Sequence, residues 1–461
     1  MKIRVAILFI TASLLASCGS GGSKNDKSGA QTDNHMVKIM TVDPGHFHAA
    51  LVQKTMFDQV SPNVYVYAPA GPDLDQHLAR IQGYNSRAVN PTGWNEIVYN
   101  GDDFFETMLN DRKGNVVVLA GNNLKKTDYI LSSVKAGFNV LADKPMVISP
   151  EAFPKLEEAF KVAAEKGVLL YDIMTERYEI TTMLQKALSG IPEVFGTLQP
   201  GTKEDPAVTK VSVHHFSKIV SGSPLIRPAW FFDVEQQGEG IVDVTTHLTD
   251  LVQWECFPEQ ILSKSDVKMT AAKRWPTPIS KEEFKGVTGL DDYPGYLAKD
   301  VKDGVLNVFA NGEMIYQLKG IWAKVSVEWK YKAPEGGGDT HFSVMKGSNC
   351  DLVIRQTSNE KFVPTLYVEN VKGNIDEFMS KLKSSVASLP YDSLTVDKLD
   401  AKTLRVNIPA KYRVGHEEHF GQVMSRYLEY LGAGKLPEWE VPNMITKYYT
   451  TTEALKLARS K

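Results

Sequence analysis

The chain has 461 residues, of which 43% are hydrophobic and 23% are charged, and its formal net charge is −3. These are the proportions of a globular protein, and the length predicts two or three domains. Proteins that bind nucleic acid usually carry a strong basic excess. The near-neutral balance therefore gives no reason to expect a nucleic-acid partner and favours small, weakly charged ligands.

The N-terminus has the layout of an export signal. Lys2 and Arg4 precede an apolar stretch, which ends in small residues followed by Cys18. This pattern predicts a signal peptide at 1–17. It resembles the bacterial lipobox, in which the cysteine receives a lipid and becomes the first mature residue. The alternative is a buried N-terminal helix with a chance cysteine.

The segment 18–36 is rich in Gly, Ser, Lys and Asp and is expected to be a flexible tether. We therefore expect a lipid-anchored protein of the cell envelope that faces the periplasm and meets the membrane through this lipid alone. No other segment approaches the roughly 20 apolar residues of a membrane helix. Only Cys256 and Cys350 remain, which excludes a disulfide framework. Two unpaired thiols are expected, and a single bridge is the alternative.

Residues 37–190 alternate short β-rich runs with helical ones, which predicts a doubly wound α/β domain. The run 116–120 is continuously apolar, as a strand covered on both faces requires. The expected strands are Ile39–Val42, Val64–Tyr67, Ile97–Tyr99, Val116–Ala120, Val140–Ala142 and Val168–Tyr171. The expected helices include Phe47–Val60, Leu74–Ile81, Thr127–Ala136 and Glu151–Glu165.

Residues 191–461 show strand-like alternation with few helical segments, and they predict an α+β domain with a large, mostly antiparallel sheet. The helices are expected at about 241–255, 373–386 and 416–433. The expected strands are Lys210–Ser217, Val305–Phe309, Met314–Leu318, Val325–Tyr331, Phe342–Met345, Leu352–Arg355 and Leu366–Val368. This order suits a dinucleotide-binding (Rossmann) domain followed by a substrate domain.

The turn after the first predicted strand is the candidate phosphate site. A dinucleotide turn of the form G-x-G-x-x-G/A lets the backbone approach pyrophosphate. Here only the central glycine, Gly45, is present, and Asp43 and His48 stand where glycines are usual. A structural turn that binds no phosphate is therefore an alternative. The candidate cofactor-binding residues of the turn are Gly45, His46, Phe47 and His48.

The end of the second strand usually carries an acid for the ribose hydroxyls of NAD. The nearest acids, Asp73 and Asp75, lie further along and would either reach back to the ribose or cap the next helix. No arginine follows that would favour a 2′-phosphate. The sequence thus favours NAD and leaves NADP open.

Two further motifs suggest chemistry. Asp143-Lys144-Pro145 follows the fifth strand, at the sheet edge where open α/β domains bind ligands. Asp243, His247 and Asp250 are spaced to lie on one helix face. Oxidising a carbinol needs a base for the hydroxyl proton, and histidine suits that role near neutral pH. Taken alone, the second motif is equally that of an ordinary amphipathic helix.

Together these segments resemble the glucose–fructose oxidoreductase / inositol dehydrogenase (Gfo/Idh/MocA) family, in an exported form with its own C-terminal domain. The family has Glu-Lys-Pro where this chain has Asp143-Lys144-Pro145. The family also has an Asp-x-x-x-His motif, which Asp243 and His247 match. The resemblance implies that Lys144 binds the reacting hydroxyl, that His247 is the general acid/base, and that Asp243 holds a neighbouring hydroxyl or the histidine. Asn122, Asp143, Lys144 and Pro145 would contact the cofactor. Asp250 is expected to be a solvated carboxylate, and a role in orienting the helix face is the alternative.

The remaining candidate residues would line the substrate cleft. Arg177 and Tyr178 follow the sixth strand, where members of the family place residues that contact substrate, and Trp230 and His341 are further candidates. The spacing of His416 and His419 is not that of a zinc protease, so we expect capping or packing roles and no metal site. Of the neighbours His214 and His215, one is expected in the cleft and the other at the surface.

The resemblance implies a dehydrogenase with tightly bound NAD or NADP that acts on a secondary hydroxyl of a sugar or glycoside, with C3 as a candidate position. One alternative is an NAD-dependent glycosidase that works by transient oxidation and elimination. Another is a sugar-binding lipoprotein whose cofactor site has decayed. A homo-oligomer through an open sheet face of the second domain also stays open.

Overall fold

The computed structural model describes residues 36–220 and 223–460. The predicted signal peptide, Cys18 and nearly all of the tether lie outside the described residues. The described chain belongs to one compact unit. None of its helices combines the length and the apolar character that a membrane span needs. Cys256 and Cys350 are both free thiols.

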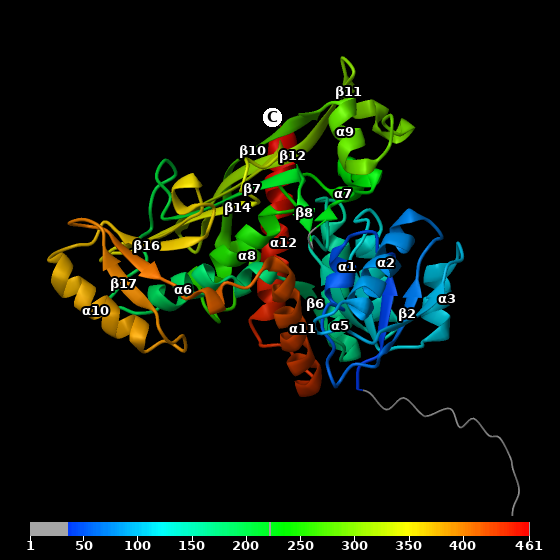
Figure 1. Ribbon diagram of the computed structural model, residues 1–461, viewed down its shortest axis with the longest axis horizontal. Helices are drawn as coiled ribbons and strands as arrows, with labels where there is room; N and C mark the ends of the chain where they lie inside the picture. Colours follow the sequence, from blue (N-terminus) through cyan, green and yellow to red (C-terminus); the bar gives the residue numbers. More distant parts are fainter. Residues whose placement is uncertain (1–35, 221–222, 461) are drawn as a thin grey trace, which may run out of the picture. The chain divides into compact units, whose positions relative to one another are not determined.

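The N-terminal part is built on a six-stranded parallel sheet, as the sequence predicts (Figure 1). The strand order is β3-β2-β1-β4-β5-β6, which places β1 and β4 side by side at the centre. All four residues of β4 are buried, because helices cover both faces of the sheet. The strands are β1 (Ile39–Val42), β2 (Asn63–Tyr67), β3 (Asn95–Tyr99), β4 (Val116–Leu119), β5 (Asn139–Asp143) and β6 (Leu170–Ile173).

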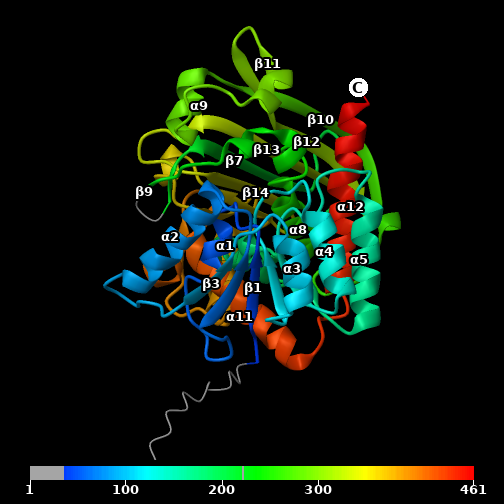
Figure 2. The same cartoon turned by 90° about the vertical axis from the view of Figure 1, so that its right-hand side faces the viewer.

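The helices of this domain pack in two groups (Figure 2). On one side of β1, α4 (Lys126–Lys135) packs against α5 (Phe153–Lys166). In the other group, α1 (His48–Leu51) packs against α2 (Pro72–Ser86) and α11 (His416–Ala433). A further helix, α3 (Phe104–Asp111), lies between β3 and β4 in sequence and was not predicted.

The prediction of a helix over Phe47–Val60 is wrong, because α1 ends at Leu51. Two backbone carbonyl groups that would accept the next hydrogen bonds of the helix accept from side chains instead. The Trp94 indole donates to the backbone oxygen of Gln53 at 2.6 Å, and Arg87 donates to the backbone oxygen of Lys54 at 2.7 Å. Val60 then forms a parallel bridge with Val37, which draws the chain into an extended conformation. The turn after β1 therefore leads into only four helical residues.

The C-terminal part contains a ten-stranded sheet that is mostly antiparallel, again as predicted. The only parallel pair among its described strands joins β7 to β13. The path runs β10-β12-β13-β7-β14-β15-β16-β18-β17, with β11 beside β12. The strands are β7 (Val208–Ser217), β10 (Val267–Ile279), β11 (Val301–Lys302), β12 (Val305–Leu318), β13 (Ile321–Lys332), β14 (Thr340–Lys346), β15 (Asp351–Arg355), β16 (Thr365–Glu369), β17 (Thr395–Lys398) and β18 (Leu404–Asn407). Smaller elements are the pair β8 (Ile219–Val220) and β9 (Ser223–Pro224) and the helices α6 (Ile180–Ser189), α7 (Val234–Gln237), α9 (Lys281–Thr288) and α10 (Ile375–Ala387).

The sequence missed β10 and incorrectly split β12 into two separate strands. β10 is an edge strand that carries Pro276 and Pro278, and only three of its thirteen residues are buried. Proline is tolerated at edges but disrupts the alternation that a pattern search requires. In β12, Asn311 and Gly312 interrupt the apolar run without ending the strand.

Two helices join the two parts of the described chain. α8 (Thr245–Cys256) packs against α6 and α12 (Glu440–Arg459), and α12 also packs against α5 and β10. α11 and α12 contribute Phe420, Tyr427 and Tyr448 to the core around the parallel sheet. The sequence did not predict α12. Its buried positions lie all around the helix and include Thr446, Lys447 and Thr450, so it has no apolar stripe.

Candidate active site

A cavity of about 430 Å³ lies at the carboxyl ends of β1, β4 and β5. Open α/β sheets bind ligands at this edge. The C-terminal part closes the cavity with residues from β7, α8, β13 and α11. Seven of the ten histidines of the chain line it: His46, His48, His214, His247, His341, His416 and His419.

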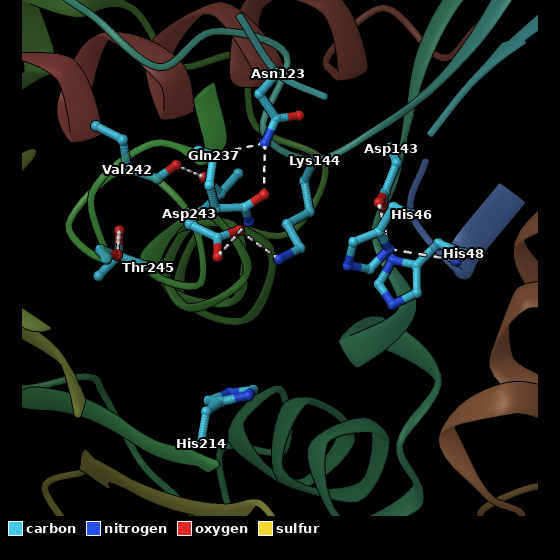
Figure 3. Close-up of polar contacts among 12 residues, drawn as sticks. His46, His48, Asn123, Asp143, Lys144, His214, Gln237, Val242, Asp243 and Thr245 are labelled. Atoms are coloured by element: carbon cyan, nitrogen blue, oxygen red, sulfur yellow. Dashed lines mark hydrogen bonds and ion pairs between the residues drawn. The ribbon is translucent and has the colours of Figure 1, made fainter. Parts of the chain in front are cut away.

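Lys144 and Asp243 both line this cavity, and their side chains point toward each other (Figure 3). Lys144 follows β5 directly, and its Nζ donates to Asp243 Oδ1 at 2.7 Å. The two side chains are only 10% and 6% exposed. Burial alone would lower the pKa of Lys144, but the carboxylates of Asp243 and Asp143 outweigh this effect and raise it. The ammonium group is therefore charged and pointed into the cavity.

The backbone around Asp243 is held by close packing. Asp243 lies in the turn before α8 and not within the helix, because α8 begins at Thr245. Gly240 precedes it, and a β-carbon on Gly240 would fall 1.7 Å from the carbonyl oxygen of Ala310 in β12. Only glycine permits this approach, which fixes the position of the turn.

A chain of amides supports the carboxylate from behind (Figure 3). The Gln237 side-chain amide donates to Asp243 Oδ2 at 3.2 Å, and the Asn123 side-chain amide donates to the backbone carbonyl of Gln237 at 2.7 Å. Asn122, predicted to contact the cofactor, donates to Gln236 at 2.7 Å and does not line the cavity. Its neighbours Gly121 and Asn123 line it instead. The loop after β4 thus positions Asp243 through α7.

His247 lies one helical turn after Asp243 and lines the same cavity. Its side chain is buried, and its Nδ1 has no hydrogen-bond partner. Burial lowers the pKa of His247 to about 3, and the positive charge of Lys144 acts in the same direction. The imidazole is therefore neutral at neutral pH. The structure brings together the three predicted catalytic residues, Lys144, Asp243 and His247.

A buried ion network holds α8 at Asp250, three residues after His247. Arg177 Nε donates to Asp250 at 2.6 Å, and Lys447 of α12 contacts Asp250 at 2.8 Å and Asp172 of β6 at 2.7 Å. Arg177 also donates to Glu440 at 2.8 Å. The prediction that Asp250 is solvated is wrong, since it is 2% exposed. Arg177 does not reach the cavity, because the network occupies its guanidinium group.

The opposite wall of the cavity carries an acid and several imidazoles. Burial alone would raise the pKa of Glu176, but His416, whose Nδ1 lies 3.5 Å away, holds it well below its usual range. His341 is half-buried, its Nε2 atom is buried with no hydrogen-bond partner, and desolvation lowers its pKa to about 4. Burial also lowers the pKa of His419.

Several predicted roles on this wall need correction. His416 and His419 line the cavity, whereas packing or capping was expected. His214 lines the cavity as one of the predicted pair. His215 is not at the surface: it is 2% exposed, and its ring lies 3.2 Å from Asp339. His341 lines the cavity, as its predicted role requires.

Trp230 and Tyr178 lie outside this cavity, although both were candidates for contacts with substrate. Tyr178 packs against the core around the parallel sheet. The Trp230 indole donates to Asp73 at 2.7 Å and borders a second cavity of about 360 Å³. This second cavity lies by the carboxyl ends of β1 and β2 and includes Asp43 and Asp73.

The two cavities lie on either side of the turn that follows β1, and Arg227 lines both. The two cavities are the candidate places for the two ends of a dinucleotide. The turn itself is crowded, because a β-carbon on Gly45 would fall 2.7 Å from Asp73 Oδ2 and 3.1 Å from the Trp230 ring. The pyrophosphate in the middle of a dinucleotide bound at this turn would therefore require the Asp73–Trp230 pair to move. Burial and the nearby Asp73 also raise the pKa of Asp43 to about 6, so this carboxylate is still largely ionised at neutral pH and opposes a phosphate at the turn.

Comparison with known proteins identifies the family. The family model described as "Putative oxidoreductase C terminal domain" matches residues 184–459, more than half of the chain. The chain belongs to this oxidoreductase family. A crystal structure described as a putative oxidoreductase from Parabacteroides merdae is 57% identical, with a TM-score of 0.90, and covers 92% of this chain and 98% of that one. No protein with a curated description matches.

More distant structures share the fold. A levoglucosan dehydrogenase in complex with NADH and levoglucosan is 12% identical, with a TM-score of 0.57 over 92% of this chain and 97% of that one. A 3-ketoreductase from Actinomadura kijaniata, in complex with NADP and TDP-benzene, is 12% identical, with a TM-score of 0.54 over the same shares. The expected likeness to oxidoreductases of the Gfo/Idh/MocA type is confirmed at the level of fold.

Proposed function

We propose that the protein oxidises or reduces a secondary hydroxyl of a sugar or glycoside with a nicotinamide dinucleotide, and that C3 of the ring is the first position to test. One observation carries this proposal. The buried Lys144–Asp243 pair and the neutral His247 converge on one cavity at the ligand-binding edge of the parallel sheet. Two structures of the same fold, named as a levoglucosan dehydrogenase and a 3-ketoreductase, support it.

Each residue then has a distinct task in the oxidation. The Lys144 ammonium group donates to the reacting oxygen and stabilises the negative charge that develops there. His247 accepts the hydroxyl proton, and Asp243 holds both Lys144 and a neighbouring substrate hydroxyl. When bound, the nicotinamide ring supplies the hydride acceptor. With that acceptor in place, a secondary alcohol would leave as a ketone, and its hydroxyl proton would rest on His247.

We further propose that the cofactor is NAD, held by residues at both cavities. Gly45 and Phe47 would hold it on the side of Lys144. Asp73 would hold the ribose hydroxyls at the second cavity, where a carboxylate opposes a 2′-phosphate. An exported enzyme has no access to cytosolic NAD, so the cofactor is expected to stay bound between turnovers and to be recycled by a second substrate.

The test measures ketone formation by mass spectrometry with a panel of glycosides. We expect Lys144→Met and His247→Asn to lower kcat by about 100-fold or more, the range of a lost general acid–base group. Lys135→Met is the matched control, because Lys135 is a half-exposed lysine on α4 far from the cavity lining. Equal activity of all three variants and the parent protein would refute the assigned roles.

A second candidate function rests on His341. Cleavage by transient oxidation needs another base for the carbon-bound proton next to the new ketone, and His341 is a second neutral imidazole in the same cavity. This function predicts net release of monosaccharide from a glycoside, together with loss of deuterium from the carbon next to the ketone. Ketone accumulation without release of monosaccharide would exclude it.

We also propose that Cys18 anchors the protein in the cell envelope, on the basis of the signal-like segment before it. Metabolic labelling with a radioactive fatty acid should label the parent protein and not Cys18→Ser. Labelling of both proteins, or of neither, would contradict this assignment.

A further inference from the structure

A cluster of two histidines and an aspartate lies in the cavity wall beside Lys144 (Figure 3). His48 Nδ1 lies 2.8 Å from Asp143 Oδ2, and His46 Nδ1 lies 3.8 Å from the same oxygen. One potential ligand atom from each residue lies within 4.8 Å of the others. The three residues come from the turn after β1 and from the end of β5, strands that flank β4.

The carboxylate of Asp143 is not fully satisfied by protein groups. Asp143 is 3% exposed, and its Oδ1 has no hydrogen-bond partner. A buried carboxylate oxygen without a partner is costly, and such an atom calls for a ligand that the protein itself does not supply. All three residues line the large cavity, so a ligand can reach them from the substrate side.

Imidazole nitrogens and a carboxylate oxygen are ligands that first-row divalent metal ions take together. Metal–ligand bonds of about 2.1 Å separate neighbouring ligand atoms by roughly 3 to 3.5 Å. Asp143 Oδ2 lies 2.8 Å from His48 Nδ1 and 3.8 Å from His46 Nδ1, and these two distances lie on either side of this range. We propose that His46, His48 and Asp143 bind a divalent transition-metal ion, whose remaining positions face the cavity.

A three-ligand set leaves positions for oxygen atoms of a substrate. The cavity places Lys144 and Asp243 beside these positions, so a polyhydroxylated ligand would meet the metal and the ion pair together. His416 borders the site as well, with its ring centroid 5.6 Å from that of His48. The proposal does not depend on the proposed function, because neither a nicotinamide nor a reaction enters the argument.

The experiment uses the purified protein, stripped of metal with EDTA and titrated with Co²⁺ alone and then with Zn²⁺ as competitor. We expect one equivalent of Co²⁺ with visible absorption bands, displacement by Zn²⁺, and a higher melting temperature with metal. His48→Gln and Asp143→Asn should weaken binding by more than about 100-fold, since even residues that only support ligands contribute 10- to 100-fold.

His46→Gln is a second variant, which leaves the His48–Asp143 contact in place and should weaken Co²⁺ binding in the same way. His214→Gln is the matched control: it changes a histidine of the same cavity outside the cluster and should bind one equivalent with the parent affinity. Melting curves without metal confirm that each variant is folded. Binding below a tenth of an equivalent, or equal binding by the parent and the three cluster variants, would overturn the proposal.

Discussion

Replacing Lys144 with methionine removes the positive partner of Asp243 and leaves a buried carboxylate. The ion pair joins Nζ to Oδ1 at 2.7 Å, and its side chains are only 10% and 6% exposed. Breaking a buried pair on one side costs about 3–5 kcal/mol. We therefore expect Lys144→Met to lower the free energy of unfolding by this amount. Asp243→Asn in the same background removes the orphaned charge and should restore about half of the loss.

The assay is a double-mutant cycle at pH 7. Each variant is unfolded with urea, and circular dichroism monitors the unfolding. The expected coupling energy of Lys144 and Asp243 is about 2–4 kcal/mol, which is the scale of two charges near contact at an effective dielectric constant of 20. The control cycle uses Lys135 and Glu158, which also lie 2.7 Å apart but are 51% and 50% exposed. That pair should couple by less than about 1 kcal/mol. Equal coupling in the two cycles would refute the argument from burial.

Three further predictions follow from the same structure. Asp73→Ala should weaken NAD binding by about 10- to 100-fold in calorimetry, the effect of a lost hydrogen bond to a charged group, and should weaken NADP binding less; unchanged NAD affinity would show that Asp73 does not hold the ribose. Burial keeps the pKa of His247 at about 3 and that of His341 at about 4, below the 6.5 of an exposed histidine. The unfolded state therefore binds more protons below pH 6.5, and the free energy of unfolding should fall by about 2 kcal/mol per histidine between pH 6.5 and 5; His247→Asn should reduce this slope in urea denaturation. Lys447→Met leaves Asp172 and Asp250 facing each other without their shared cation and should lower the free energy of unfolding by about 3–5 kcal/mol, whereas Lys456→Met, on the exposed side of the same helix, should not change it measurably.

The sequence predicted the parallel sheet well because its strands are short, continuously apolar and separated by helical runs. It failed where neighbouring segments override the local pattern. The helix after β1 is cut short by Trp94 and Arg87, which lie far along the chain and take its carbonyl groups. Helix α12 has no apolar stripe, because its polar residues are buried in contacts with α5 and α8.

The candidate catalytic residues could be singled out from the sequence, because Lys144 and the Asp243–His247 motif each have a local signature. Their meeting point could not, since it depends on a glycine, Gly240, that lies against the backbone of β12. Arg177 was assigned to substrate because no local pattern reveals that Asp250 and Glu440 occupy its guanidinium group.

The histidine cluster was missed for a related reason. His46 and His48 looked like defects in a phosphate turn, and nothing in their sequence indicates that Asp143 lies against them. Likewise, Trp329 and Asp339 line the cavity but lie in strand and loop segments without a recognisable motif. In both cases the residues meet only because elements that are distant in the sequence lie next to each other in the fold.

The most direct test of the account is to purify the protein, denature it, and measure NAD(H) and NADP(H) in the supernatant by mass spectrometry. The account predicts close to one NAD(H) per chain and little NADP(H), because the two cavities would hold the cofactor between turnovers. If no nicotinamide dinucleotide is released, and added NAD does not raise the melting temperature of the intact protein, the crowded turn at Gly45 excludes the cofactor and the proposed oxidoreductase function is wrong.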